Sequence, residues 1–150
     1  MVLDLLKEYP VIVDLPVIWG EMDALQHLNN VVYFRYFETG RIAYFDKMKM
    51  WVTMEQTGIG PILASTWCRY KAPLTYPDTV SVGTRVTLIE KDRFTMEHVI
   101  VSHKIERVAA EGGGVLVAYH YPEKKKTVMP EALIEYIQEV EGGKAAITRD

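Results

Sequence analysis

Residues 31–48 form a helical pattern that is apolar around most of its circumference. At about 100° per residue, the polar side chains of this segment fall into one narrow stripe, interrupted only by Ile42. They are Arg35, Glu38, Thr39, Asp46 and, just beyond the segment, Lys49. A helix of this kind must be covered on most of its sides. The sequence contains no second long apolar helix, so we expect a strongly curved sheet to wrap around this one.

Five further segments have strand patterns and would supply such a sheet. They are residues 11–19, 62–70, 79–89, 93–102 and 106–121. The third is the cleanest, because apolar or small side chains alternate there with polar ones. Its predicted inward face consists of Val80, Val82, Thr84, Val86 and Leu88.

Prolines and glycines indicate where the sheet ends and bends. Pro16 favours an edge position for the first strand, since proline cannot donate a ladder hydrogen bond. The glycines at residues 112–114 would weaken a flat strand, so we expect a bulge or bend there. Pro130 opens a C-terminal helix over residues 131–141, and residues from about 144 to 150 are expected to form a flexible tail. The predicted order, β-α-β-β-β-β-α, is an α+β arrangement.

The composition limits the class of protein. One hundred and fifty residues, 49% of them hydrophobic, suit one domain over residues 1–150 with a single core. A net charge of −3 argues against broad binding to a nucleic-acid backbone. The N-terminus lacks the basic start and apolar centre of a signal peptide, and no run reaches transmembrane length. The lone cysteine, Cys68, cannot form an internal disulfide, which fits a cytoplasmic location.

A carboxylate stands close to the start of the central helix. Asn29 and Asn30 are good N-cap residues, and free N–H groups in the first helical turn leave a partial positive charge there. Asp23 lies seven residues before Asn30, in a short polar loop. Taken alone, an aspartate in such a loop is usually a turn residue.

The run WGEMDALQHLNNVVYFRYFETGRI, residues 19–42, resembles the signature of hot-dog-fold acyl-CoA thioesterases related to 4-hydroxybenzoyl-CoA thioesterase. In that family a G-D-x-D loop and a glycine precede a Y-x-R-x-F-E helix. The resemblance continues in PILASTWCRYKAPLTYPDTV, residues 61–80. Two positions depart from the pattern. Glu21 replaces the first aspartate, and Gln26 replaces the glycine, a residue that permits close backbone approach.

The resemblance implies the hot-dog fold, in which a curved antiparallel five-stranded sheet wraps around one long central helix, here with a short C-terminal helix. It also implies hydrolysis of an acyl-CoA thioester to the free acid and CoA. Asp23 would be the nucleophile or the general base, and N–H groups of residues 28–31 would polarise the thioester carbonyl. His27 and Asn30 would orient substrate or water. No metal and no bound organic cofactor is expected.

Glu38, on the central helix, is the alternative catalytic carboxylate. Pairing with Arg35 or Arg41 favours a structural role for it instead. The sequence contains no G-x-S-x-G elbow, P-loop, dinucleotide fingerprint or zinc-ligand spacing that would indicate another mechanism.

Two groups of residues are expected to bind the substrate. The first is apolar and would form a deformable acyl pocket: Met48, Trp51, Met54 and Ile59. The second is basic and would contact the CoA phosphates: Arg69 and Lys71, with Arg85 and residues 124–126 also available. A lysine run is usually only a solvated turn, so the first two are preferred.

The uncharged stretch 62–66 would be a poorly protected sheet edge, so we expect a homodimer or homotetramer with active sites near the subunit boundary. The small-molecule partner would be acyl-CoA, with no nucleic acid and no membrane. Two alternatives stay open at this point. The chain could hydrolyse thioesters of acyl carrier protein, or it could be a non-catalytic acyl-binding hot-dog module.

Overall fold

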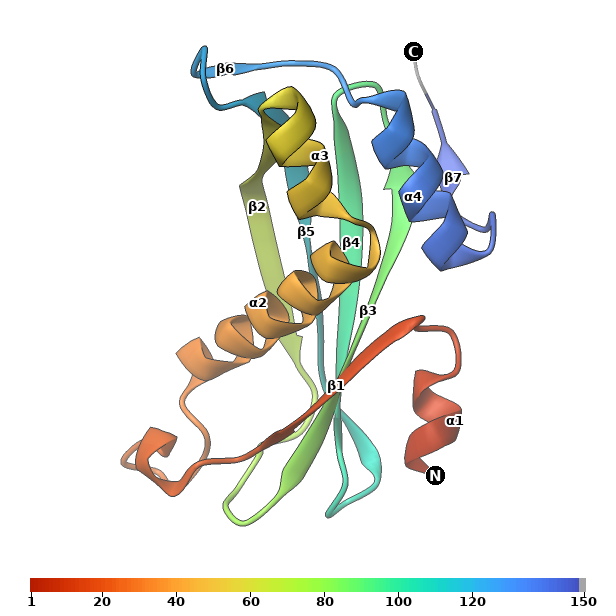
Figure 1. Cartoon of the computed structure of the whole chain (residues 1–150). Helices are drawn as coiled ribbons and strands as arrows, with labels where there is room; N and C mark the ends of the chain where they lie inside the picture. Colours follow the sequence, from red (N-terminus) through yellow and green to blue (C-terminus); the bar gives the residue numbers. More distant parts are fainter. Residues whose placement is uncertain (149–150) are drawn as a thin grey trace.

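The computed structural model describes residues 1–148 (Figure 1). Along the chain the elements are α1 (Val2–Leu6), β1 (Val11–Pro16), the 3-10 turn η1 (Trp19–Glu21), α2 (Asn30–Lys47), α3 (Met50–Thr57), β2 (Ile59–Tyr70), β3 (Thr79–Ile89), β4 (Arg93–Ser102), β5 (Arg107–His120), β6 (Lys125–Lys126), α4 (Glu131–Glu141) and β7 (Ala146–Ile147). The predicted α+β class is therefore observed.

Five long strands form one antiparallel sheet in the order β1-β3-β4-β5-β2. The edge position that Pro16 predicted for β1 is confirmed, and β2 forms the other edge. Two short strands extend the sheet: β6 pairs with β5, and β7 pairs in parallel with β3. Part of the expected flexible tail is thus attached to the sheet through β7, while residues 149 and 150 lie outside the described residues.

Helix α2 crosses one face of the sheet, and α3 and α4 lie on the same side (Figure 1). The fully buried Tyr44 of α2 packs with Phe94 of β4 and Ile137 of α4 in one apolar cluster. The N-terminal half of α2 packs through Phe37 in a second cluster. The opposite face of the sheet is covered in part by α1, where Leu6 joins a third cluster. The predicted arrangement, a curved sheet around one long helix, is therefore present.

The three glycines of β5 do not form the expected bulge. Each is paired on both sides, with β2 and with β4, in regular register. A side chain at Gly112 would overlap the ring of Phe37, so this glycine lets α2 approach the sheet closely. The register shifts lie elsewhere: within β2 between Leu63 and Ser65, within β3 between Val86 and Leu88, and at Ala109 of β5, opposite the step from Ile100 to Val101.

The register shift in β3 changes which side chain enters the core. Beyond it Ile89 is fully buried in the main cluster, whereas Leu88, which the alternation had placed inside, is only partly buried. A bulge advances the strand by one residue and so reverses the faces. Period-two alternation alone cannot detect such an extra residue.

Two helices were missed by the sequence analysis, and one strand is shorter than predicted. Helix α3 forms between two residues in the left-handed conformation, Lys49 (φ 55°) and Gly58 (φ 74°). Helix α1 is only five residues long. The first strand ends at Pro16 because the chain turns into η1 at Trp19. Such short elements carry too few residues to show a period.

Candidate active site

Asp23 organises the loop between η1 and α2. Its carboxylate Oδ1 accepts hydrogen bonds from the N–H groups of Leu25, at 2.8 Å, and His27, at 3.3 Å. The Asp23 N–H donates to the His27 carbonyl oxygen at 2.7 Å. The turn role that the sequence allowed is therefore real. Within residues 1–148 the other carboxylate oxygen, Oδ2, makes no hydrogen bond, and the side chain is exposed.

Gln26 closes the same loop in a conformation that suits glycine. Its φ is 66°, in the left-handed region, and its N–H donates to the Asp23 carbonyl oxygen at 3.1 Å. A β-carbon is unfavourable there. The structure therefore explains physically why glycine is usual at this position in the family that the sequence resembles.

We expect Gln26→Gly to stabilise the protein by about 0.5–1 kcal/mol, because relief of left-handed strain exceeds the extra entropy lost by glycine. Urea unfolding at fixed protein concentration would measure the gain. Gln26→Ala is the matched control, since it shortens the side chain but keeps the β-carbon, and it should give no gain. Equal effects of both variants would contradict the explanation.

The start of α2 leaves one backbone donor free. Asn29 is the N-cap, and its side-chain oxygen accepts from the Val31 N–H at 3.0 Å. The N–H groups of Leu28 and Asn29 donate to backbone carbonyl oxygens at 2.8 and 3.0 Å. Of the predicted donor group, residues 28–31, only the Asn30 N–H has no acceptor in the part of the chain that the structure describes. Asn30 is thus the first helical residue rather than the cap.

Three clefts surround this helix start. The Asp23 cleft, of about 660 Å³, is lined by Trp19, Gly20, Met22, Asp23, Gln26, Thr75 and Tyr76. The Lys71 cleft, of about 270 Å³, is lined by Tyr33, Tyr70, Lys71, Ala72 and Pro73. The α2–β2 cleft, of about 240 Å³, is lined by Val31, Phe34, Arg35, Glu38, Arg41, Leu63 and Thr66. None of the three clefts is lined by Asn30 itself. One is lined by the loop before it, and the other two are lined by Val31 and by Tyr33 in the first turns of α2.

Aromatic groups fix the floor of the Lys71 cleft. The Tyr70 hydroxyl donates to the Asn30 carbonyl oxygen at 3.2 Å, and the Tyr70 ring packs edge-on against Tyr33, with 4.9 Å between centroids. Burial raises the pKa of the Tyr33 hydroxyl, so this ring stays neutral at physiological pH. This packing ties the end of β2 to the first turn of α2.

The predicted basic residues take different positions around this floor. Lys71 lines the cleft and forms an ion pair with Glu111 at 3.0 Å. Arg69 lies over the Trp67 ring, with its guanidinium carbon 5.9 Å from the ring centroid. Lys71 is therefore near the helix start, whereas Arg69 is held against the exposed face of the edge strand.

His27 stays close to Asp23 through its backbone alone. Its ring is exposed and makes no hydrogen bond within residues 1–148. It is available to solvent or to a bound molecule, but nothing in the described part of the fold orients it toward the carboxylate. The structure therefore brings Asp23, His27 and Asn30 into one loop and helix start. Of their three side chains, only that of Asp23 is held by hydrogen bonds within residues 1–148.

The predicted acyl-pocket residues lie at the other end of α2. Eighteen residues separate Asn30 from Met48, which is about 27 Å of helix. Met48 is fully buried in the main apolar cluster, and Met54 and Ile59 pack against that cluster. Trp51 is half exposed, and its indole N–H donates to Asp46 at 2.6 Å. These four residues are therefore not brought together with Asp23 within one chain.

Glu38 does not form the ion pair that the sequence suggested. Arg35 pairs instead with Glu21, at 3.7 Å, and Arg41 is buried beside Glu38 without a salt bridge to it. Glu38 is exposed and lines the α2–β2 cleft. Arg41 was not predicted to belong to a site. Its place outside the polar stripe of the helix is the one sequence feature that could have indicated its burial.

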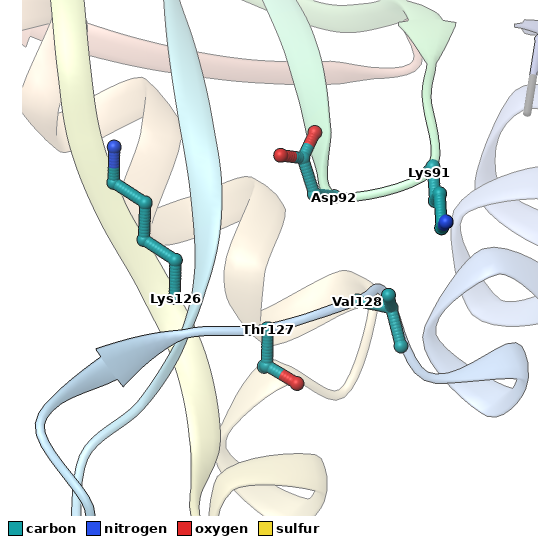
Figure 2. Close-up of a pocket in the computed structure, with 5 residues that line it drawn as sticks. All are labelled: Lys91, Asp92, Lys126, Thr127 and Val128. Atoms are coloured by element: carbon teal, nitrogen blue, oxygen red, sulfur yellow. The ribbon is translucent and has the colours of Figure 1, made fainter. Parts of the chain in front are cut away.

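A fourth cleft lies at the opposite end of the sheet (Figure 2). Its volume is about 420 Å³, and it is lined by Lys91, Asp92, Lys126, Thr127 and Val128. Lys126 belongs to β6, which pairs with the far end of β5 at Tyr119. Within one subunit, the lysine run is therefore remote from Asp23 and the helix start.

Two kinds of feature are absent from residues 1–148. No three His, Cys, Asp or Glu side chains are grouped there so that they could hold a metal ion. No helix in this part of the chain combines the length and apolar character needed to cross a membrane.

The chain is similar in sequence to a known protein family and to known proteins. The sequence profile of the thioesterase-like superfamily matches residues 17–137. Protein THEM6 of Xenopus laevis is 32% identical over 112 residues, which cover 73% of this chain and 52% of that protein. The chain thus spans about half the length of that relative.

Solved structures agree with the fold. A thioesterase from Thermus thermophilus, complexed with coenzyme A and Zn, is similar with a TM-score of 0.80 and 31% identity, over 91% of this chain and 97% of that one. A DHNA-CoA thioesterase from Staphylococcus aureus has a TM-score of 0.76 at 22% identity, over 91% and 97%, and shows the fold alone. The predicted hot-dog fold is confirmed.

Proposed function

The chain belongs to the thioesterase-like superfamily, and on this basis we propose that it is an acyl-CoA thioesterase whose catalytic carboxylate is Asp23. The observation that carries the proposal is the presence of two groups that lie seven residues apart at the start of α2. A carboxylate with a free oxygen lines the Asp23 cleft, and the Asn30 N–H at the start of α2 lacks an acceptor among residues 1–148. Thioester hydrolysis needs both a base or nucleophile and an oxyanion donor.

The proposed chemistry divides between these groups. The thioester carbonyl oxygen accepts from the Asn30 N–H, where the positive end of the helix dipole stabilises the negative charge that develops on it. In one route Asp23 Oδ2 removes a proton from the attacking water, the CoA thiolate leaves, and the acid is released. In the other, Oδ2 attacks the carbonyl carbon, the thiolate leaves, and water then hydrolyses the resulting acyl–Asp23 anhydride to the acid and free Asp23. Asp23 Oδ1 keeps its two backbone hydrogen bonds throughout, which fixes the carboxylate without a second side chain.

The carrier is proposed to be coenzyme A. The similar Thermus thermophilus thioesterase is complexed with coenzyme A, and Lys71 lies next to the helix start in this chain. Its ammonium group would meet a CoA phosphate as a charge-assisted contact. Arg69, two residues earlier on β2, is the second basic group proposed for this role.

Release of free thiol from a panel of acyl-CoA thioesters tests the proposal. We expect turnover with at least one class of acyl group and no requirement for added metal. The same acyl groups on acyl carrier protein separate the two carriers. Tight binding of acyl-CoA without any thiol release would contradict the proposal and support a non-catalytic acyl-binding module.

The edge strand β2 leads us to propose that the active unit is at least a homodimer. Four of its large side chains are exposed: Ile62 by 37%, Leu63 by 41%, and Trp67 and Tyr70 by 46% each. An exposed apolar edge of this length pairs readily with another chain. Because β2 also borders the Lys71 cleft and the α2–β2 cleft, a second copy there would place both near a subunit boundary.

Light scattering at micromolar concentration should therefore give at least twice the chain mass. Ile62→Lys adds a charge to the edge and should shift the mass toward one chain. Ile12→Lys, on the other edge strand, is the matched control and should not. A single-chain mass for the unmodified protein would contradict the prediction.

A further inference from the structure

Arg41 is a buried cation without an acceptor. The residue is only 8% exposed, and its Nη1 is shielded from solvent and has no hydrogen-bond partner within residues 1–148. Burial lowers the pKa of the guanidinium, and the charge of nearby Glu38 opposes that shift. A buried guanidinium N–H without an acceptor is costly, so such a group is normally paired.

The neighbours of Arg41 do not supply the missing acceptor. His98 lies close enough to feel its charge, but His98 Nε2 is itself buried without a partner among residues 1–148. Glu38 is one helical turn away and forms no salt bridge with it. The fold therefore presents a cation that a molecule from outside these residues could pair with.

Arg41 lines the α2–β2 cleft, which starts beside the proposed reaction centre. Val31, the residue after Asn30, lies at one end, and Arg41 lies ten residues further along α2, about 15 Å away. Side chains on a helix lean toward its N-terminus, so the guanidinium is somewhat nearer to Val31 than its Cα is. The walls between them are apolar, from Phe34 on the helix and Leu63 on β2.

We propose that the α2–β2 cleft receives the acyl chain of the substrate and that Arg41 binds a carboxylate at its far end, which makes dicarboxylic acyl-CoA thioesters the preferred substrate class. The proposal rests on the thioesterase function proposed above and adds the identity of the acyl group to it. With the thioester at Asn30, an extended chain reaches Arg41 along apolar walls. A chain that ends in methyl leaves the guanidinium unpaired, whereas a carboxylate accepts its N–H groups.

The charges along the cleft favour the same class. Of the two cations in the cleft, Arg35 is paired with Glu21, so Arg41 is opposed only by Glu38. Glu38 is exposed to solvent, where its field is weakened, whereas Arg41 is buried, where interactions are stronger. A carboxylate at Arg41 is therefore attracted by the buried guanidinium more strongly than it is repelled by Glu38.

Matched pairs of substrates test the inference in the unmodified protein. Each pair has one chain length and differs only at the distal end: hexanoyl-CoA with adipoyl-CoA, octanoyl-CoA with suberoyl-CoA, and decanoyl-CoA with sebacoyl-CoA. In the pair whose length fits, kcat/KM should be about tenfold higher for the dicarboxylic member, a difference of ~1.4 kcal/mol. Preference for the methyl-ended member in every pair, or no preference in any, overturns the inference.

Arg41→Met links the preference to this residue. Methionine keeps an unbranched apolar stem and removes the buried charge, so we expect the fold to persist. The tenfold preference should disappear, with a fall for the dicarboxylic substrate and little change for its partner. Arg107→Met, which removes an exposed cation from the start of β5, is the matched control and should retain the preference. An unchanged preference in Arg41→Met overturns the inference. A variant that loses the dimer mass instead of the substrate preference overturns it too.

Binding measurements separate this inference from the function beneath it. Thioether analogues of the same acyl-CoA pairs cannot be hydrolysed, and calorimetry gives their affinities directly. If no thioester in the panel is cleaved, the thioesterase proposal fails, and the thioether pairs still decide whether Arg41 selects a carboxylate. Tighter binding of the carboxylate-ended member, lost in Arg41→Met, supports the inference. Equal binding overturns it.

Discussion

Asp23→Asn is expected to lower kcat for thioester hydrolysis at least about a hundredfold, the low end of what a positioned base supplies. The amide keeps an oxygen that can accept from the Leu25 and His27 N–H groups, so the loop should hold its shape. It removes the negative charge that either proposed role requires. Steady-state kinetics would measure the fall, and the melting temperature and acyl-CoA affinity should change little.

Two further variants make this result specific. Asp23→Ala removes both the charge and the turn acceptor, so it should lose stability as well as activity, which separates the two roles of the residue. Glu38→Gln tests the alternative carboxylate, which lines the neighbouring cleft. A large fall in kcat for Glu38→Gln together with an unaffected Asp23→Asn would move the catalytic group onto α2 and contradict the proposal.

The long elements could be predicted because their side-chain pattern repeats many times. Strands β3 and β4 and helix α4 begin and end where the sequence placed them, and α2 begins one residue early, at Asn30. Period and capping act locally, so the sequence displays them. The bulge in β3 is different, because it depends on the pairing with β4 that no local pattern shows.

The resemblance predicts which residues form the site, but it does not predict their hydrogen-bond partners. The resemblance drew attention to Asp23 and to the four N–H groups of residues 28–31, yet the loop pairs all but one of those donors internally. The acyl pocket was placed at Met48 because methionine and tryptophan suit deformable pockets, but the same properties suit a core. Arg41 shows the opposite case. Its place outside the polar stripe of α2 is compatible with burial, but the lack of a hydrogen-bond partner for Nη1 follows only from the packing of α2 against the sheet.

Lowering the pH from about 6.5 to 4.5 is expected to remove roughly 2–3 kcal/mol of stability through His98 alone, at ~1.4 kcal/mol per pH unit. The ring is 1% exposed and stacks on Phe37, with centroids 4.9 Å apart. Its Nδ1 shares a hydrogen bond of 2.9 Å with Thr84. Burial, and then the charge of Arg41, lowers the pKa of His98 to about 3 in the folded protein.

The direction of this effect follows from proton binding. An unfolded chain has a histidine pKa of about 6.5, so below that pH the unfolded state takes up a proton that the folded state refuses. The contribution is therefore complete above pH 6.5 and is lost as the pH falls toward 3. Urea unfolding at several pH values and one protein concentration would measure it, since assembly also affects apparent stability.

His98→Gln provides the control. The amide cannot take up a proton, so the variant should lose less stability than the unmodified protein between about pH 6.5 and 4.5. The difference between the two losses should be close to the amount assigned to His98. The absolute stability of the variant is not the readout, because a buried amide carries its own cost. The slope difference is the readout, since the other three histidines are common to both proteins. Parallel slopes for the two proteins would mean that His98 is protonated inside the fold, in spite of its burial beside Arg41.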